Sequence, residues 1–377
     1  MTNDEGRMTS LSDIIRERIR REGPISFESF MEMALYHPGL GYYAREVSPV
    51  GRDGDYYTGP HTHVLFGAMM GKQMEEMWSL LDEPRRFTVV EMGAGAGHLA
   101  ADLLDYLRGR PLYECLRYVI IEPNPFFRHI QRALLKSRGH QASWHREPGS
   151  MASFTGCFLS NELLDSLPVR LVEMNEELLE IYVDAIGAGL RELKRPASPE
   201  TRQYLDEFRI FLPSGYRTEI NLRIRDLLSV IRGRLHAGFV LTADYGFPAA
   251  EYYGPARNRG TLLCYRRHQA GENPLAYPGE QDITAHVNFS SLHKWGGEMG
   301  FETLGYAAQG TYLVSMGIHE LLPGYVGNPP DPVALARAKQ LIMPEGMGET
   351  HKMMIQAKGP AGFEISGYAL RNEMARL

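Results

Sequence analysis

The most constraining stretch of this chain is an apolar segment that runs directly into three closely spaced glycines. Phe87 to Val90 is apolar enough for a buried strand, and Gly93, Gly95 and Gly97 follow it. Leucines then recur at helical spacing between residues 99 and 107, as expected for an amphipathic helix. A strand, a glycine-rich turn and a helix open a doubly wound α/β domain, and the turn is where such domains bind nucleotide-like ligands. The sequence therefore predicts an α/β fold.

The spacing of the glycines distinguishes two classes of ligand. Dinucleotide-binding turns follow G-x-G-x-x-G, whereas this turn follows G-x-G-x-G and has His98 in place of the third glycine of that pattern. The next apolar run, residues 118–121, ends in Glu122. An acidic residue there accepts hydrogen bonds from ribose hydroxyls. Taken alone, Glu122 would be read as a solvated strand end; the preceding glycine turn favours the ribose role.

The composition narrows the function classes only slightly. In 377 residues, 44% are hydrophobic and 23% charged, which is ordinary for a soluble globular protein. A net charge of −6 gives no reason to expect nucleic-acid binding, which favours basic surfaces. The three cysteines form no C-x-x-C pair or Cys/His cluster, so we expect no metal site and a reducing, cytoplasmic location.

Nothing in the sequence predicts membrane insertion or export. No apolar run approaches the length of a membrane span. The N-terminus lacks a secretory apolar core, and its acidic residues argue against a mitochondrial transit peptide.

Changes of pattern along the chain predict its division. Residues 1–86 are interpreted as an N-terminal helical extension, and residues 87–168 and 216–358 as the α/β core. Residues 169–215 interrupt the alternation of strands and helices, so we interpret them as an inserted cap. Residues 359–377 are interpreted as a C-terminal tail. A helix is predicted over 219–235, and the poorly periodic segment 247–289 is long enough to suggest a functional loop.

Five separated strings of residues agree with one known family. The glycine turn with Glu91 before it has the E-x-G-x-G-x-G form that resembles the first motif of class I S-adenosylmethionine (SAM) methyltransferases. The other strings are Gly54–Pro60, Ser160–Val169, Asp244–Gly246 and Asp282–Ser290. Together they resemble the MidA-like SAM-dependent methyltransferases, from about residue 25 to 358. That family includes a mitochondrial assembly factor that dimethylates an arginine of a respiratory complex I subunit.

The resemblance implies the fold, the cofactor and the substrate class. We expect a class I SAM-methyltransferase fold, Rossmann-like, with a seven-stranded, mostly parallel sheet, an N-terminal helical extension and an inserted cap. The expected cofactor is SAM, and the expected partner is a protein substrate such as a complex I subunit. The residues expected to bind SAM are Asp55, Thr58, Glu91, Gly93, Gly95, Gly97, Glu122 and Asn161. Asp55 and Thr58 have an alternative, because their loop could serve only to pack the N-terminal helices.

The expected catalytic residues are chosen because a guanidinium substrate is bound and polarised by carboxylates. Glu162 and Asp165 are three residues apart, so a helical turn there would place both on one face. Glu162 is expected to orient the guanidinium, with Asp165 second; Asp165 is equally well explained as a helix N-terminal charge. His286 would relay the proton, although an isolated loop histidine is more often structural. Asp244 either serves the site or organises its own turn.

Two other functions compete with this interpretation. A SAM-binding assembly chaperone without turnover would need neither Glu162 nor Asp165 for chemistry. An NAD-dependent oxidoreductase would need the dinucleotide spacing that His98 interrupts.

Overall fold

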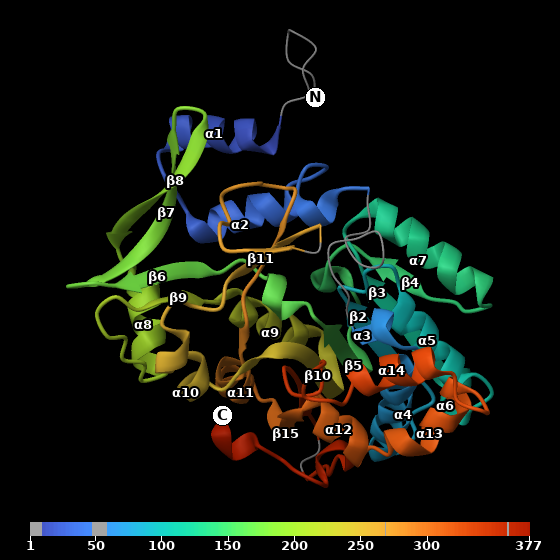
Figure 1. Ribbon diagram of the computed structural model, residues 1–377. Coiled ribbons are helices and arrows are strands. Elements are labelled where there is room, and N and C mark those ends of the chain that lie inside the picture. Colours follow the sequence, from blue (N-terminus) through green and yellow to red (C-terminus); the bar gives the residue numbers. More distant parts are fainter. Residues whose placement is uncertain (1–9, 47–58, 268, 360–361) are drawn as a thin grey trace. The chain divides into compact units, whose positions relative to one another are not determined.

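The computed structural model describes residues 10–46, 59–267, 269–359 and 362–377, so Asp55 and Thr58 lie outside the described residues (Figure 1). Two compact units share the chain. The first unit takes its residues from Met1–Tyr56, Asp165–Ile224 and Phe247–Asn288, and the second from Tyr57–Leu164, Arg225–Gly246 and Phe289–Leu377.

The second unit is built on a mixed sheet. Seven of its strands follow one another in the order β15 (Glu302–Ala308), β16 (His351–Lys358), β10 (Leu235–Phe247), β5 (Phe154–Asn161), β2 (Phe87–Met92), β3 (Leu116–Ile121) and β4 (Ser143–His145). Among these seven strands, every neighbouring pair from β10 to β4 is parallel, whereas β16 is antiparallel to β10 and β15 is antiparallel to β16. The predicted α/β fold with a mostly parallel sheet is confirmed.

Helices flank this sheet, because its strands carry apolar side chains on both faces. Val89 and Val90 of β2 belong to two different buried clusters. The helices that lie wholly in this unit are α3 (Gly59–Thr62), α4 (Leu65–Leu80), α5 (His98–Leu107), α6 (Pro111–Cys115), α7 (Pro125–Ser137), α11 (Phe289–Glu298), α12 (Gln309–Ser315), α13 (Ile318–Val326) and α14 (Pro332–Gln340). Short 3-10 turns are η2 (Pro148–Ser150), η5 (Ser366–Tyr368) and η6 (Met374–Arg376).

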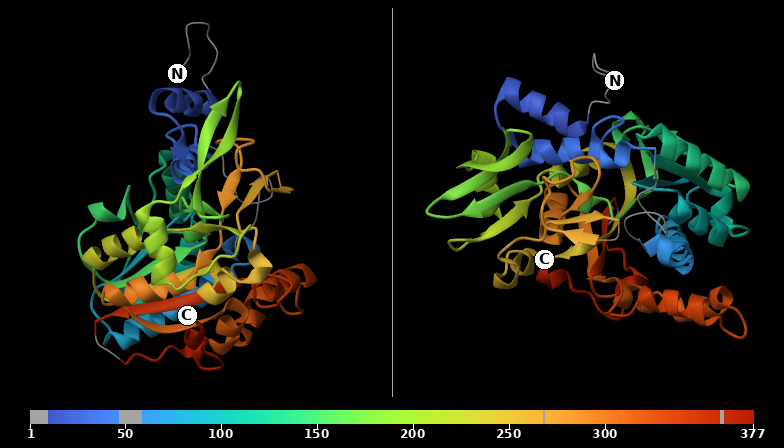
Figure 2. Two further views of the ribbon diagram at one scale, coloured as in Figure 1. Left: turned by 90° about the vertical axis from the view of Figure 1, so that its left-hand side faces the viewer. Right: turned by 45° about the horizontal axis from the view of Figure 1, so that its top comes forward.

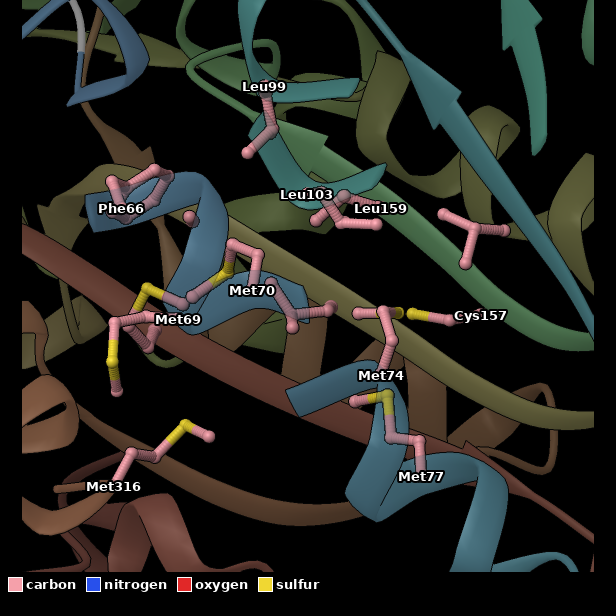
Figure 3. Close-up of a cluster of buried hydrophobic side chains, with 14 of the residues drawn as sticks. Phe66, Met69, Met70, Met74, Met77, Leu99, Leu103, Cys157, Leu159 and Met316 are labelled. Carbon is pink, nitrogen blue, oxygen red and sulfur yellow. The ribbon is translucent and has the colours of Figure 1, made fainter. Parts of the chain in front are cut away.

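The larger of these clusters is rich in methionine. Four methionines of α4 face the sheet, where Cys157 and Leu159 of β5 project toward them (Figure 3). The residues labelled there are Phe66, Met69, Met70, Met74, Met77, Leu99, Leu103, Cys157, Leu159 and Met316. Unbranched methionine side chains fill irregular gaps, so this core accommodates α4 and α5 against the same face of the sheet.

The first unit combines antiparallel sheets with the N-terminal helices. One sheet has the order β1 (Ile25–Ser26), β7 (Leu178–Ile186), β6 (Arg170–Met174) and β9 (Arg217–Ile220), with β8 (Gly189–Pro196) also paired to β7. Figure 2 shows β7 and β8 as a long two-stranded ribbon. A second sheet has the order β12 (Gln269–Gly271), β11 (Leu263–Arg266) and β13 (Asp282–Thr284). The helices are α1 (Leu11–Glu22), α2 (Phe27–Tyr36), α8 (Pro199–Glu207) and α10 (Ala249–Tyr252), with 3-10 turns η1 (Tyr42–Ala44) and η4 (Pro255–Arg257).

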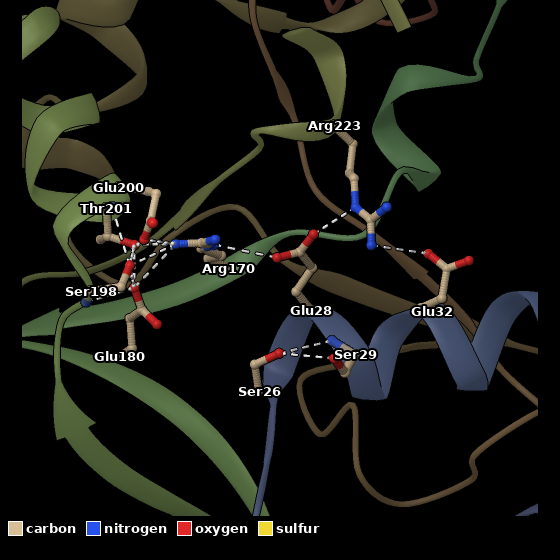
Figure 4. Close-up of polar contacts among 10 residues, drawn as sticks. All are labelled: Ser26, Glu28, Ser29, Glu32, Arg170, Glu180, Ser198, Glu200, Thr201 and Arg223. Atoms are coloured by element: carbon tan, nitrogen blue, oxygen red, sulfur yellow. Dashed lines mark hydrogen bonds and ion pairs between the residues drawn. The ribbon is translucent and has the colours of Figure 1, made fainter. Parts of the chain in front are cut away.

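A polar network joins α2 to the sheet of the first unit (Figure 4). Arg170 on β6 donates to Glu28 of α2 at 3.3 Å and to Ser198, the N-cap of α8, at 2.7 Å. Arg223 pairs with the same Glu28 and with Glu32. Isolated surface ion pairs contribute little to stability, but here one carboxylate is shared by two arginines from distant parts of the chain. The network therefore fixes which segments lie beside one another within this unit.

Some predicted elements differ from the structure. The helix predicted over 219–235 is α9 (Arg223–Arg234), because residues 217–220 pair with β6 as a strand. The segment 247–289, predicted as a loop, contains the four strands β11, β12, β13 and β14 (Val287–Asn288). The two compact units also differ from the predicted segments. Helix α4, predicted in the N-terminal extension, belongs to the second unit, and residues 247–288, predicted in the core, belong to the first. Among the described residues, we find no helix with the length and apolar character needed to cross a bilayer.

Candidate active site

The three glycines of the turn after β2 have left-handed backbones, with φ of +80° at Gly93, +52° at Gly95 and +89° at Gly97. A Cβ at Gly93 would lie 2.9 Å from Leu163, and one at Gly97 would lie 3.2 Å from Gln131. At Gly95 a Cβ would meet nothing within 4 Å. Gly93 and Gly97 are thus needed for packing, whereas Gly95 leaves open space beside the backbone, where a ligand can approach closely.

Glu122 lies directly after β3 and is buried. Its Oε1 accepts from the Asn124 backbone N–H at 2.8 Å, and among the described residues it forms no ion pair. Burial raises the pKa of Glu122 to about 7, although its hydrogen bonds with Asn124 and Gln131 act in the opposite direction. A carboxylate accepts about four hydrogen bonds, so this one keeps capacity for the two hydroxyls of a ribose.

Gln131 of α7 connects the glycine turn with Glu122. Its Nε2 donates to the Gly95 carbonyl at 2.8 Å and lies 3.4 Å from Oε2 of Glu122. Its Oε1 accepts from the indole N–H of Trp144 at 2.8 Å, which fixes the orientation of the amide. Sequence reasoning missed Gln131, because a single glutamine within a helix carries no motif.

Glu91, expected at the cofactor, is buried within the sheet layer. The Tyr118 hydroxyl donates to its carboxylate at 2.7 Å, and burial raises the pKa of Glu91 to about 7. This contact joins neighbouring strands β2 and β3. A direct role of Glu91 in binding SAM stays a prediction.

Glu162 follows β5 in a left-handed conformation, with φ of +48°. This region is uncommon for residues other than glycine, and strained backbones of this kind cluster at functional sites. Its Oε1 accepts from the Gly59 N–H and from the Asn161 side-chain amide, each at 3.1 Å. Both hydrogen bonds use one oxygen, so Oε2 has no hydrogen-bond partner among the described residues. Asn161 therefore orients Glu162, and Gly59 was not among the predicted residues.

Asp244, at the end of β10, supports the turn that carries Glu162. Its Oδ2 accepts from the backbone N–H groups of Leu163 at 3.1 Å and Leu164 at 2.9 Å, and its Oδ1 accepts from Tyr245 at 2.9 Å. Burial raises the pKa of Asp244 to about 7, and the charge of Glu162 adds to this shift. The aspartate thus organises the backbone of a neighbouring strand end as well as its own.

His351, the first residue of β16, was missed by sequence reasoning. Its Nε2 lies 3.9 Å from Oε1 of Glu162, although the two residues are far apart in the chain. The antiparallel pairing of β16 with β10 places His351 opposite Tyr245, next to Asp244. No local sequence pattern predicts a contact between residues so far apart in the chain.

Asp165 and His286 belong to the first unit and are described within it. Asp165 lies in the 3-10 turn η3 (Leu164–Ser166) and not in an α-helix, and its carbonyl accepts from the Ala285 N–H at 2.9 Å. The His286 backbone N–H donates to the Thr261 hydroxyl at 3.0 Å, and its ring packs on Phe247. Their catalytic roles stay predictions. Among the described residues, no group of three or more side chains is arranged to hold a metal ion.

Comparison with known proteins identifies relatives over most of the chain. A model of the Methyltransf_28 family, described as S-adenosyl-L-methionine-dependent methyltransferases, matches residues 69–307. The mitochondrial protein arginine methyltransferase NDUFAF7 homolog of Drosophila melanogaster is 27% identical over 342 residues, which are 81% of this chain and 75% of that protein. Human NDUFAF7, also named a mitochondrial protein arginine methyltransferase, is 25% identical over 378 residues, 92% of this chain and 82% of that protein.

Two crystal structures from Burkholderia thailandensis share the fold. A COG1565 superfamily member bound to S-adenosyl-homocysteine is 32% identical with a TM-score of 0.88, covering 97% of this chain and 96% of that one. A native structure of a COG1565 superfamily protein from the same organism is 31% identical with a TM-score of 0.84 and the same coverage. They confirm the class I methyltransferase fold.

The residues of the glycine turn fit SAM as the cofactor. Gly95 leaves room beside the backbone, and Glu122 is a buried carboxylate with spare acceptor capacity. The family match covers more than half of the chain and agrees with the resemblance in its sequence motifs. The chain belongs to the Methyltransf_28 family of SAM-dependent methyltransferases.

Proposed function

We propose that this methyltransferase transfers the methyl group of SAM to the guanidinium of an arginine in a protein substrate. The observation that carries the proposal is the carboxylate of Glu162. Two donors hold its Oε1, its backbone is left-handed, and its Oε2 has no hydrogen-bond partner among the described residues. The relatives named as protein arginine methyltransferases support the same substrate class.

The chain's own residues would act by orientation and charge. When bound, SAM supplies a methyl group on a positively charged sulfur. Glu162 offers a fixed carboxylate, and a guanidinium binds carboxylates through paired N–H donors. Holding the nucleophile in line with the methyl group removes much of the entropic cost of the reaction. Asp244 keeps this geometry by binding the two N–H groups that follow Glu162.

The target and the compartment belong to the same proposal. We propose a respiratory complex I subunit as the first substrate to test, because the MidA-like motifs of the sequence resemble a family with such a member. We also propose a cytoplasmic location, in line with free cysteines at positions 115, 157 and 264.

Glu162→Gln tests the proposal. The amide has nearly the same shape, so the fold and SAM binding should survive, while methyl transfer to protein should fall at least ~10²-fold because the charged acceptor is lost. Labelled methyl transfer into an extract of cells lacking the gene measures this, with methyl-arginine identified by mass spectrometry. Glu302→Gln, an exposed glutamate of β15, serves as the matched control.

Either of two results would contradict the proposal. Full transfer by Glu162→Gln would remove Glu162 from the mechanism. Full biological complementation by a Glu162→Gln protein without detectable transfer would favour the assembly chaperone instead.

A further inference from the structure

His351 presents a buried polar atom that the fold itself does not use. Nine-tenths of the residue is buried, and its Nε2 has no hydrogen-bond partner among the described residues. Leaving a buried polar group unpaired costs about 1–3 kcal/mol, so such a group calls for an explanation. Nε2 lies 3.9 Å from Oε1 of Glu162, beyond hydrogen-bond distance. The imidazole thus faces the carboxylate of the candidate site without bonding to it.

The other ring nitrogen indicates where the proton of a neutral imidazole resides. Nδ1 lies 3.1 Å from the Thr350 hydroxyl, and that hydroxyl donates its proton to the Gly346 carbonyl at 3.5 Å. When the Thr350 hydroxyl gives its one proton to the Gly346 carbonyl, its oxygen accepts from Nδ1–H, and the lone pair of the neutral imidazole is then on Nε2. Two acceptors, Nε2 and the Glu162 carboxylate, therefore face each other, and no described residue places a donor between them.

The other charged or titratable groups around His351 are already engaged. Both oxygens of Asp244 accept from backbone N–H groups. The Lys352 ammonium donates to the Glu349 carbonyl at 2.6 Å. The Tyr245 ring packs edge-on against the imidazole, with centroids 5.6 Å apart. Among the described residues, Nε2 of His351 is thus a buried atom without a hydrogen-bond partner, and it lies beside the Glu162 carboxylate.

We propose that His351 is the proton acceptor of the transfer reaction and that the substrate guanidinium binds beside His351 and Glu162, with its N–H groups donating to Nε2 and to the Glu162 carboxylate. This inference rests on the arginine methyltransferase function proposed above. The guanidinium nitrogen bonds to the methyl carbon while the carbon–sulfur bond breaks and leaves its electron pair on sulfur. The surplus proton of that nitrogen passes to Nε2 and then to solvent, so the methylated guanidinium keeps a single positive charge.

His351→Asn tests the inference, because the amide stays polar but does not titrate. The methyl acceptor is the extract of cells lacking the gene, and initial rates of methyl-arginine formation are measured from pH 5.5 to 8.5. General-base contributions are typically 10²- to 10⁴-fold, so the rate should fall at least ~10²-fold. With SAM at saturating concentration at every pH, the wild-type rate should rise as the pH increases from 5.5 to 8.5, and this rise should be lost in the variant. S-adenosyl-homocysteine affinity, measured by calorimetry, should change less than about twofold.

His293→Asn is the matched control. His293 is a half-buried histidine of α11 in the same unit, and its Nδ1 lies 2.9 Å from the Thr303 hydroxyl. This variant should keep the wild-type rate and pH profile. His351→Gln is measured in parallel, in case the asparagine variant does not fold.

The possible failures are distinguishable. A wild-type rate and pH profile in His351→Asn would overturn the inference and leave the proposed function intact. Loss of S-adenosyl-homocysteine binding, or unfolding of both His351 variants, would make the residue structural and overturn the inference as well. A wild-type protein that forms no methyl-arginine would overturn both proposals.

Discussion

The glycine turn and the Glu162 cluster, both in the second unit, are built in opposite ways. The turn is one contiguous stretch, and its partners come soon after it in the chain: Glu122 directly follows the next strand, β3, and Gln131 lies in α7, the helix after that strand. The Glu162 cluster draws on Gly59, Asp244 and His351, which come from three other parts of the chain. A cofactor shared by many enzymes can be bound by a local motif, whereas a site for a particular substrate depends on how distant strands are arranged.

Gly95→Val should produce the largest difference between these two regions. Its side chain would fill the open space at Gly95, and SAM affinity should fall at least about 100-fold, because both the approach of the ligand and the left-handed backbone are disturbed. Calorimetry with S-adenosyl-homocysteine measures this. Gly187→Val is the control for backbone strain. Gly187 has a similar φ of +56° and equally open surroundings, but it lies in the β7–β8 turn, so this variant should strain the backbone without affecting SAM affinity. Unchanged affinity in a folded Gly95→Val protein would argue against ligand binding at the turn.

Asp244→Asn should disturb the Glu162 cluster without disturbing the glycine turn. An amide cannot accept three backbone N–H groups as the carboxylate does, so the turn carrying Glu162 should loosen. We expect methyl transfer to fall by between about 10- and 100-fold, and the free energy of unfolding in urea to fall by about 1–3 kcal/mol. SAM affinity should stay within about twofold. The exposed Asp226→Asn of α9 is the control, and an equal loss of SAM affinity would mean that the regions are not separable.

The smallest expected effect is the dependence of SAM affinity on pH, which we attribute to Glu122. Ribose hydroxyls donate to the ionised form of Glu122, whose pKa burial raises to about 7. SAM affinity should therefore rise up to about 10-fold between pH 6 and 8. The raised pKa also means that this group lowers the stability of the unliganded fold as pH rises from about 4.5 to 7. Glu122→Gln should remove the dependence of affinity on pH; if the dependence persists, Glu91 or Asp244 is responsible, because burial shifts their pKa values similarly.

The same contrast explains what the sequence could predict. The strand, the glycine turn and Glu122 were readable because periodicity and spacing are local properties, and Glu162 was readable because a specific string surrounds it. Gln131 was not, since a single glutamine within a helix carries no motif, and His351 was not, since its contact is with a residue distant in the chain. Gly59 lies within the string Gly54–Pro60, but its contact with Glu162, 103 residues away, could not be predicted. The strands β11, β12 and β13 within 247–288 were missed because antiparallel pairing between them supplied the order that their sequence pattern lacks.

The place of β16 in the sheet has a consequence for the order of assembly. It lies between β10 and β15, although β15 is synthesised before it. During synthesis, therefore, β15 has no neighbour in the sheet, and the edge of β10 stays open until β16 emerges. Unpaired strand edges invite association with other chains. A protein truncated before His351 would keep its glycine turn but expose the edge of β10, and we expect it to aggregate when fully synthesised rather than to bind SAM as a monomer.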